Sequence, residues 1–242
     1  MVAMASVKTS EGRVRSAGNA GWAAIYSFNG NKTITTSGGG MVVSQDRGVI
    51  ERARKRSQQA REAVVWYEHC ELGYNYRMSN IVAAIGVGQL AYLEQIVAKK
   101  REIFGWYCEL LEKNTGVRMM PEAGYGKCSR WLTVAEVLGP VSVCNEECAR
   151  RARQGAGTKG CGEPSIPVMA LIALLEEQNI ESRPVWKPMH LQPVFKGARI
   201  YGGAVSERFF ANGICLPSGA GLERNDVVRI CDQVKRSIEG VD

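Results

Sequence analysis

The chain has 242 residues, of which 45% are hydrophobic and 23% are charged. This composition is typical of a globular protein and excludes a disordered tail, a collagen-like repeat and a disulfide-stabilised miniprotein. Domains commonly span about 100–200 residues, so the length fits one large domain or two modest ones. The net charge is +7, and residues 1–66 alone carry +6, which favours anionic partners, including nucleic acids and phosphorylated small molecules.

The sequence contains no segment that predicts a membrane partner. No window holds the roughly 18 consecutive apolar residues that a membrane-spanning helix needs. Residues 1–15 carry scattered Ser, Lys and Arg and lack the apolar stretch of a secretory signal. We therefore expect a cytoplasmic protein, in which the eight cysteines, without a framework spacing, are reduced thiols.

In the first part of the chain, short apolar runs alternate with glycine turns. Residues 23–28 predict a buried strand that runs into an Asn-Gly turn. The β-branched run 33–36 and the run 41–44 predict two further strands, separated by three consecutive glycines.

Helical patterns follow. A basic helix is predicted over about 47–64, after an Asp N-cap. Residues 67–76 are polar and aromatic and predict a loop. Ser79 opens a long helix, because apolar residues recur at three- and four-residue steps over 81–111. A helix of that length would join two lobes, with a kink expected near Gly105.

The remainder of the chain alternates strands and helices. Residues 131–138 predict a strand, 166–178 a helix, 180–185 a strand and 226–239 a terminal helix. Residues 139–164 are rich in Cys, Gly and Arg without a clear period, and they predict an irregular insertion. The alternation predicts a mixed α/β or α+β fold without internal repeats.

Lys32 is the residue that points most directly to chemistry. It lies in a Gly/Asn turn between two apolar runs, where an ammonium is costly to bury unless it is paired or neutral. Burial lowers the pKa of a lysine and makes its amine a nucleophile for Schiff-base chemistry. The spacing alone favours the simpler alternative, a loop lysine whose ammonium reaches solvent.

The wider sequence around Lys32 resembles one family. Residues 26–41, which read Tyr-Ser-Phe-Asn-Gly-Asn-Lys at their start and Gly-Gly-Gly-Met at their end, resemble the Schiff-base segment of the DegT/DnrJ/EryC1/StrS family of pyridoxal-phosphate-dependent sugar aminotransferases. Further matches follow in the family's order at residues 73–90, 130–133, 181–193 and 215–219. The resemblance runs from about residue 18 to the C-terminus, except over 139–164.

The resemblance implies the C-terminal part of a fold type I pyridoxal-phosphate transferase. Residues 1–16 would be an unmatched basic tail, 17–100 the remnant of the large cofactor domain, and 101–242 the small domain with the insertion 139–164. In the family, a segment before the lysine supplies the aromatic that stacks on the cofactor ring and the aspartate that pairs with its nitrogen. Only 31 residues precede Lys32, so an N-terminally truncated or frameshifted member is expected.

The resemblance also implies the residues of a cofactor site. Lys32 would form the Schiff base with pyridoxal 5'-phosphate and move the proton during amino transfer. Ser27 would bind the cofactor phosphate. Asn75 would reach the same phosphate from the neighbouring subunit, so the expected working unit is a homodimer with a shared active site. Arg77 would lie near that anionic end, with an ion pair to a local carboxylate as an equal alternative.

Trp186, Lys187 and His190 resemble the family's substrate-facing segment. A lysine and a histidine beside an aromatic residue suit a nucleotide-sugar diphosphate and its pyranose ring. The sequence Trp-Lys-Pro-Met-His resembles members that act on UDP-4-keto-6-deoxy-hexosamines. The predicted function is transfer of an amino group, expected from glutamate, to the 4-keto carbon of a nucleotide-linked sugar in cell-surface glycan biosynthesis.

Two other functions stay open. One is a catalytically inactive fragment that dimerises around Asn75, and the other is a basic nucleic-acid-binding module built on residues 52–61. That basic run lacks the interleaved aromatics on which single strands stack, so a solvated helix face and no nucleic-acid partner are preferred. Cys144, Cys148 and Cys161 include no Cys-x-x-Cys pair, so no metal is expected.

Overall fold

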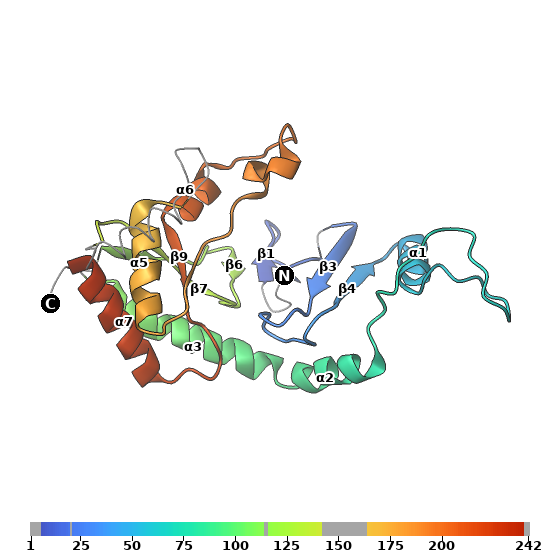
Figure 1. Ribbon diagram of the computed structural model, residues 1–242, viewed down its shortest axis with the longest axis horizontal. Coiled ribbons are helices and arrows are strands. Elements are labelled where there is room, and N and C mark those ends of the chain that lie inside the picture. Colours follow the sequence, from blue (N-terminus) through green and yellow to red (C-terminus); the bar gives the residue numbers. More distant parts are fainter. Residues whose placement is uncertain (1–5, 20, 114–115, 142–163, 240–242) are drawn as a thin grey trace. The chain divides into compact units, whose positions relative to one another are not determined.

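The computed structural model describes residues 6–19, 21–113, 116–141 and 164–239 (Figure 1). Cys144, Cys148, Cys161 and most of the 139–164 insertion lie outside these ranges. The chain divides into two compact units. Unit 1 consists of Met1–Lys99 and Glu122–Trp131, and unit 2 of Lys100–Pro121 and Leu132–Asp242.

Unit 1 contains two small antiparallel sheets. In the first, β1 (Ser6–Lys8) lies between β2 (Val14–Ser16) and β6 (Gly126–Lys127), so part of the predicted N-terminal tail is a hairpin. In the second, β3 (Ala23–Ser27) pairs with β4 (Gly40–Ser44), which confirms two predicted strands. The expectation that the first of them is buried is wrong, because β3 is mostly exposed or half-buried.

The strand predicted over 33–36 is also wrong, because these residues lie in the loop between β3 and β4. Gln89 satisfies both backbone groups of Thr35: its Nε2 donates to Thr35 O at 2.6 Å, and its Oε1 accepts from Thr35 N at 3.0 Å. Thr36 N donates to Phe28 O at 2.8 Å. A side-chain amide thus supplies the hydrogen bonds that a neighbouring strand would otherwise provide.

The basic helix is shorter than predicted: α1 spans Arg47–Ser57. The Asp46 N-cap is confirmed, because its carboxylate accepts from Val49 N at 3.3 Å. The helix ends early because Ala60 adopts a left-handed backbone (φ 52°) and its N donates to Lys55 O at 2.9 Å, a bond that closes the helix C-terminus. The loop predicted over 67–76 contains no helix or strand.

The prediction of a single long helix over 81–111 is wrong. The segment forms two helices, α2 (Asn80–Leu90) and α3 (Leu93–Leu111), with a bend of 62° between them. The break follows α2 directly, while the predicted hinge, Gly105, lies inside regular α3. Leu93 packs with Ile34 in the small apolar cluster of unit 1. Among the described residues no single helix is long and apolar enough to cross a membrane; only α2 and α3 together meet that criterion, by length and composition, as a bent pair.

Unit 2 is built on a four-stranded antiparallel sheet of order β5-β7-β9-β8. Its strands are β5 (Val117–Met119), β7 (Thr133–Val137), β9 (Gly213–Leu216) and β8 (Arg183–Pro184). β7 confirms the strand predicted over 131–138, and the strand predicted over 180–185 shrinks to β8. The predicted helices 166–178 and 226–239 are confirmed as α5 (Ile166–Glu177) and α7 (Arg224–Glu239), and α6 (Ala204–Asn212) precedes β9. The mixed α/β class is confirmed.

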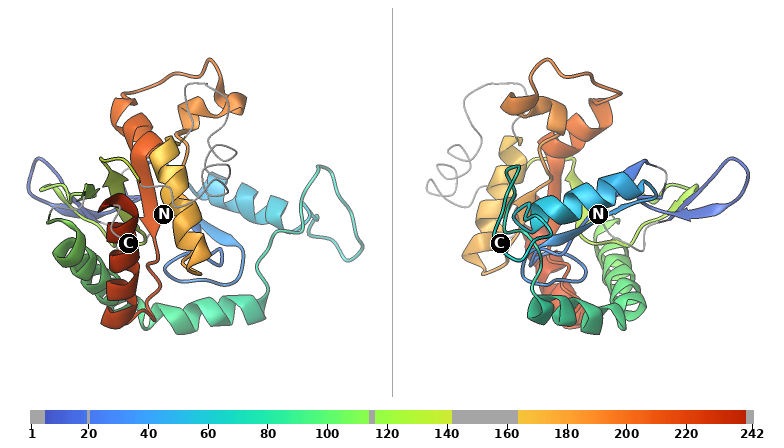
Figure 2. Two further views of the ribbon diagram at one scale, coloured as in Figure 1. Left: turned by 60° about the vertical axis from the view of Figure 1, so that its left-hand side comes forward. Right: turned by 90° about the vertical axis from the view of Figure 1, so that its right-hand side faces the viewer.

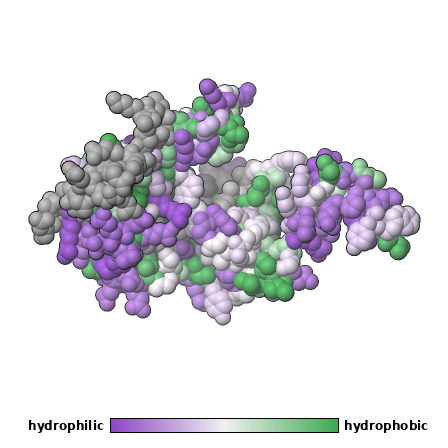
Figure 3. All heavy atoms as spheres, in the orientation of Figure 1, coloured by the Kyte–Doolittle hydropathy of each residue, from purple (hydrophilic) through white to green (hydrophobic). Residues whose placement is uncertain are grey.

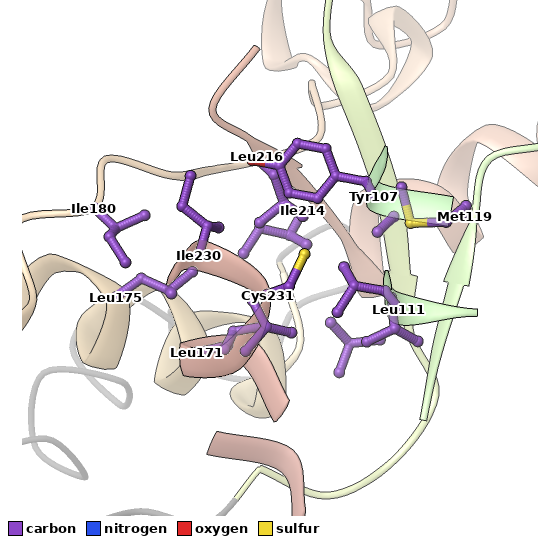
Figure 4. Packing of buried hydrophobic residues seen from close by; sticks show 14 of the residues in the cluster. Tyr107, Leu111, Met119, Leu171, Leu175, Ile180, Ile214, Leu216, Ile230 and Cys231 are labelled. Carbon is purple, nitrogen blue, oxygen red and sulfur yellow. The ribbon is translucent and has the colours of Figure 1, made fainter. Parts of the chain in front are cut away.

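The hydrophobic core of unit 2 lies between this sheet and helices α3, α5 and α7. Figure 4 shows Tyr107 and Leu111 of α3, Leu171 of α5 and Cys231 of α7 gathered over Ile214 of β9. All five are at most 1% exposed. In Figures 1 and 2, α5 and α7 lie side by side. Buried apolar area of this kind stabilises a fold by about 25 cal/mol per Å².

The matched segment 215–219 is fastened to this core. Lys100 Nζ donates to Ser218 O at 2.7 Å, and Tyr107 Oη donates to Pro217 O at 3.0 Å. Ser218 Oγ accepts from Thr133 N at 2.7 Å. Burial lowers the pKa of Lys100. These bonds give the segment a structural role at the end of β9.

The buried thiol of Cys231 predicts a loss of stability in alkaline solution. Burial raises its pKa from 9.0 to about 12. The folded thiol therefore keeps its proton where the unfolded thiol loses it, so the stabilisation is complete below pH 9.0 and is lost as pH rises toward about 12. Urea unfolding of wild type and Cys231→Ala across this range should show a shallower decline in the variant. Parallel declines would contradict the assignment.

Candidate functional site

Lys32 lies in the loop that joins β3 to β4 and is half-buried. Its Nζ lies 3.9 Å from the centroid of the Trp131 ring, a cation–π contact. Trp131 Nε1 in turn donates to Asn31 O at 2.6 Å. Both contacts lie within unit 1. The hydrogen bond holds the indole against the loop, and the cation–π contact orients the Lys32 side chain. The sequence did not assign this role to Trp131.

Two hydroxyl groups near Lys32 in the sequence have spare hydrogen-bonding capacity. Ser27 ends β3, and among the described residues its Oγ accepts only a long bond, of 3.4 Å, from Asn29 N. Thr33 Oγ1 is buried and has no hydrogen-bond partner among the described residues. A buried unsatisfied hydroxyl is costly, so this loop is suited to a polar ligand that would pair with it. An amine and hydroxyl groups are the group types that bind an aldehyde and a phosphate, so the residue types of this loop are compatible with pyridoxal 5'-phosphate.

Asn75 and Arg77 lie on the segment that follows α1 and line one hollow of ≈ 510 Å³ in unit 1. Arg54 and Arg61 also line it, and its walls hold more cations than carboxylates. Arg77 has no ion pair among the described residues, so the structure does not support the local ion pair that was its alternative. Figure 3 shows mainly hydrophilic residues over α1.

The local carboxylates of this region are already paired with other cations. Lys55 Nζ lies 2.7 Å from Glu62 Oε1 and 3.6 Å from Glu71 Oε1, and Arg56 lies 3.1 Å from Glu71 Oε2. The hydrogen bond between Glu62 and Lys55 raises the pKa of Lys55 and lowers that of Glu62. Arg54 and Arg77 have no ion pair among the residues that the structure describes, which leaves them available to an anionic ligand.

Trp186, Lys187 and His190 lie together on one segment of unit 2. The segment leaves the sheet after Val185, whose N donates to Gly213 O at 3.1 Å. Trp186 is 56% exposed, and Lys187 Nζ lies 5.9 Å from the Phe210 ring centroid. His190 lies in the short 3-10 helix η1 (Met189–Leu191). Thus the predicted residues form three local groups: Ser27 with Lys32, Asn75 with Arg77, and this segment.

Replacing Gln89 tests whether the conformation of the Lys32 loop depends on its hydrogen bonds to α2. Gln89→Leu leaves two backbone groups of Thr35 unpaired and should cost about 1–3 kcal/mol of stability. It should also weaken binding of pyridoxal phosphate, measured by fluorescence titration, because the loop loses its anchor. Gln95→Leu makes the same change at an exposed position of α3 and should leave both quantities near wild type. Equal effects of the two variants would rule out the anchoring role.

The DegT/DnrJ/EryC1/StrS aminotransferase family model matches residues 2–159 and 161–235. The match therefore extends over most of the N-terminal tail and the insertion, beyond the segments that carry the resemblance. The chain is 41% identical over 222 residues to a protein of Bacillus subtilis named as the pyridoxal phosphate-dependent aminotransferase EpsN, covering 90% of this chain and 51% of EpsN. This chain belongs to the DegT/DnrJ/EryC1/StrS aminotransferase family.

Two relatives are named for the sugars they form. The chain is 33% identical over 219 residues to a GDP-perosamine synthase of Vibrio cholerae, covering 90% of this chain and 53% of the relative. It is 36% identical over 125 residues to a UDP-4-amino-4,6-dideoxy-N-acetyl-beta-L-altrosamine transaminase of Campylobacter jejuni, covering 51% of this chain and 33% of that one. The chain spans about half the length of the first two relatives, EpsN and the Vibrio synthase.

The fold agrees with the folds of solved aminotransferases. The aminotransferase TlmJ from Streptoalloteichus hindustanus superposes with a TM-score of 0.71 at 24% identity, over 96% of this chain and 55% of TlmJ. A Streptococcus pneumoniae protein described as a sugar aminotransferase, solved in its PLP form, gives a TM-score of 0.73 at 19% identity, over 98% and 56% of the two chains. Aminotransferases of the DegT/DnrJ/EryC1/StrS family depend on pyridoxal phosphate.

Proposed function

We propose that this chain takes part in amino transfer, dependent on pyridoxal 5'-phosphate, to the 4-keto carbon of a nucleotide-linked 6-deoxy sugar. The amino donor would be glutamate, and the product would serve cell-surface glycan biosynthesis. The observation that carries the proposal is the environment of Lys32. Its amine lies over Trp131, and in sequence it stands between Ser27 and Thr33, whose hydroxyl has no partner in the described part of the chain. The printed names of the relatives support a nucleotide-linked amino sugar as product.

In this proposal the cofactor supplies an aldehyde and an electron-withdrawing ring. Lys32 would provide the amine that holds the cofactor and would carry the proton that moves during amino transfer. Ser27 would donate a hydrogen bond to the phosphate, because its hydroxyl proton is free among the described contacts. Trp131 keeps the Lys32 side chain directed within the loop.

Asn75 and Arg77 would act on an anionic group. Phosphate oxygens accept hydrogen bonds from a carboxamide and from a guanidinium, and Arg77 has no ion pair among the described residues. We propose that these two residues serve the active site of a second copy, in a homodimer with a shared site. Trp186, Lys187 and His190 would hold the nucleotide-linked sugar.

The exposed apolar residues of α2 favour a second candidate, an inactive fragment that associates with another chain. Ile81 is 78% exposed, Ile85 52% and Val87 68%, and Figure 3 shows hydrophobic residues at the surface over α2. Several exposed apolar side chains on one helix are typical of an interaction surface. This candidate predicts association without cofactor capture. The division into domains at 17–100 and 101–242 and the cytoplasmic location stay predictions.

The acceptor can be tested directly. The purified chain is supplied with pyridoxal phosphate, ¹⁵N-labelled glutamate and either a UDP-linked or a GDP-linked 4-keto-6-deoxy sugar, and the nucleotide-sugars are analysed by mass spectrometry. The proposal expects an amino sugar that carries the label. A chain that captures the cofactor but labels neither sugar would place the acceptor outside this class, and a chain that only associates would favour the second candidate.

A further inference from the structure

The side chain of His190 is hydrogen-bonded to a carboxylate for which the sequence predicted no role. Glu207 of α6 places Oε1 2.8 Å from His190 Nε2. The His190 side chain is 16% exposed, and that of Glu207 is 50% exposed. An ionised carboxylate only accepts hydrogen bonds, so Nε2 carries the proton and donates it to Glu207. Such a partner fixes both the orientation of the ring and its tautomer.

The backbone before α6 is shaped to admit this pair. Gly203 precedes α6 with φ 127°, a conformation that side-chain-bearing residues rarely adopt, and its O accepts from Glu207 N at 2.9 Å. A Cβ on Gly203 would lie 3.1 Å from Glu207 Oε1 and 3.4 Å from His190 Nε2. Glycine at this position therefore lets the helix start close against the imidazole.

The other ring nitrogen is left for a ligand. Nδ1 of His190 has no hydrogen-bond partner in the described part of the chain, and with Nε2 protonated the neutral ring presents Nδ1 as an acceptor. An acceptor pairs with a hydroxyl or amine and not with phosphate oxygens, which also accept. Lys187 on the same segment carries a cationic donor, which suits phosphate oxygens. His190 Nδ1 is an acceptor, so the two side chains would bind different groups of a ligand.

We propose that Glu207 is a positioning residue that holds His190 with Nε2 protonated, so that Nδ1 accepts a hydrogen bond from a hydroxyl of the sugar ring. The sugar is that of the nucleotide-linked substrate, so this assignment of the ligand rests on the proposed function. The positioning itself rests only on the geometry of Glu207, His190 and Gly203. The cationic Lys187 would bind the diphosphate of the same substrate.

The positioning is tested without any ligand. The chain has two histidines, His69 and His190, so ¹⁵N NMR of the ring nitrogens can be assigned with a His69→Gln variant. At about pH 8.5, where an imidazole is ordinarily neutral, His190 should show a single Nε2–H tautomer. Glu207→Gln keeps an acceptor and should preserve it, whereas Glu207→Ala should give a mixture. A tautomer distribution unchanged by Glu207→Ala would overturn the positioning role.

The ligand assignment is tested with UDP-N-acetylglucosamine and UDP as probes in calorimetric titrations. Glu207→Ala should weaken binding of UDP-N-acetylglucosamine about tenfold, the effect of one lost hydrogen bond, and leave UDP binding unchanged. Glu207→Gln should restore most of the affinity. Glu112→Ala, at an exposed glutamate of unit 2, is the matched control and should bind both probes as wild type does.

The outcomes separate this proposal from the proposed function. Equal weakening of UDP and UDP-N-acetylglucosamine by Glu207→Ala would overturn the contact with the sugar hydroxyl. Wild-type chain that binds neither probe would count against both the nucleotide-sugar function and the sugar contact, while the NMR result would still decide whether Glu207 positions His190.

Discussion

Lys32→Ala is expected to abolish amino transfer by this chain. The variant removes the amine that lies 3.9 Å from the Trp131 ring centroid, and a shortened side chain can neither hold the cofactor covalently nor carry a proton. Loss of the proton carrier alone costs about 10²–10⁴-fold in rate, and loss of covalent capture adds to it. The rate is measured with ¹⁵N-glutamate as donor, and capture is measured as the visible absorption that develops on adding pyridoxal phosphate.

The control for this variant is Lys196→Ala, which removes an exposed lysine outside the predicted site segments. It should develop the same absorption and the same rate as wild type. If Lys32→Ala still develops the absorption at wild-type cofactor concentration, another lysine is the reactive amine. If neither wild type nor Lys196→Ala develops it, the inactive associating fragment becomes the better description.

Leu171→Ala is expected to produce the largest loss of stability in unit 2. Leu171 is 0% exposed and packs in the cluster that joins α3, α5, α7 and the sheet. Truncation of a buried leucine to alanine removes apolar burial and leaves a cavity, which costs about 2–5 kcal/mol. Urea unfolding followed by circular dichroism measures the change.

Ile166→Ala is the matched change on the same helix, because Ile166 of α5 is 56% exposed. It should alter the free energy of unfolding by about 0.5 kcal/mol or less. Equal losses for the two variants would show that the α5 face carrying Leu171 does not pack in the way the structure indicates.

Local sequence patterns predicted most of the regular elements. The Asp46 cap, the Ser79 cap, β4, α5 and α7 depend on residues that are neighbours in the chain, so short-range rules apply to them. Each cap is confirmed by its own hydrogen bond to a backbone N–H of the first helical turn.

The errors arise where a distant residue decides the local backbone. Gln89 pairs with Thr35 across 54 positions and replaces the ladder of a strand, so the β-branched run at 33–36 gave a false strand signal. The bend between α2 and α3 places Leu93 beside Ile34, a packing preference that apolar periodicity cannot locate. β3 appears in the sequence as a buried strand, yet most of its residues are accessible in the structure.

In the candidate site, too, the sequence pointed to residues within local motifs and missed those that act from a distance along the chain. The resemblance of the motifs pointed to Lys32, Ser27 and His190, because each lies in a contiguous run of family-like sequence. Trp131 lies in the matched run 130–133 but was given no predicted role, and Glu207 lies outside the matched runs; each contacts one of those residues from another part of the chain. Such supporting contacts become visible only when the tertiary structure is known.

The most direct test of the account is to locate the lysine that pyridoxal phosphate modifies. The chain is incubated with the cofactor, reduced with borohydride, digested and mapped by mass spectrometry. The account predicts one modified site, on the peptide that contains Lys32. Modification spread over exposed lysines such as Lys196, or confined to another lysine while Lys32 stays unmodified, would contradict it.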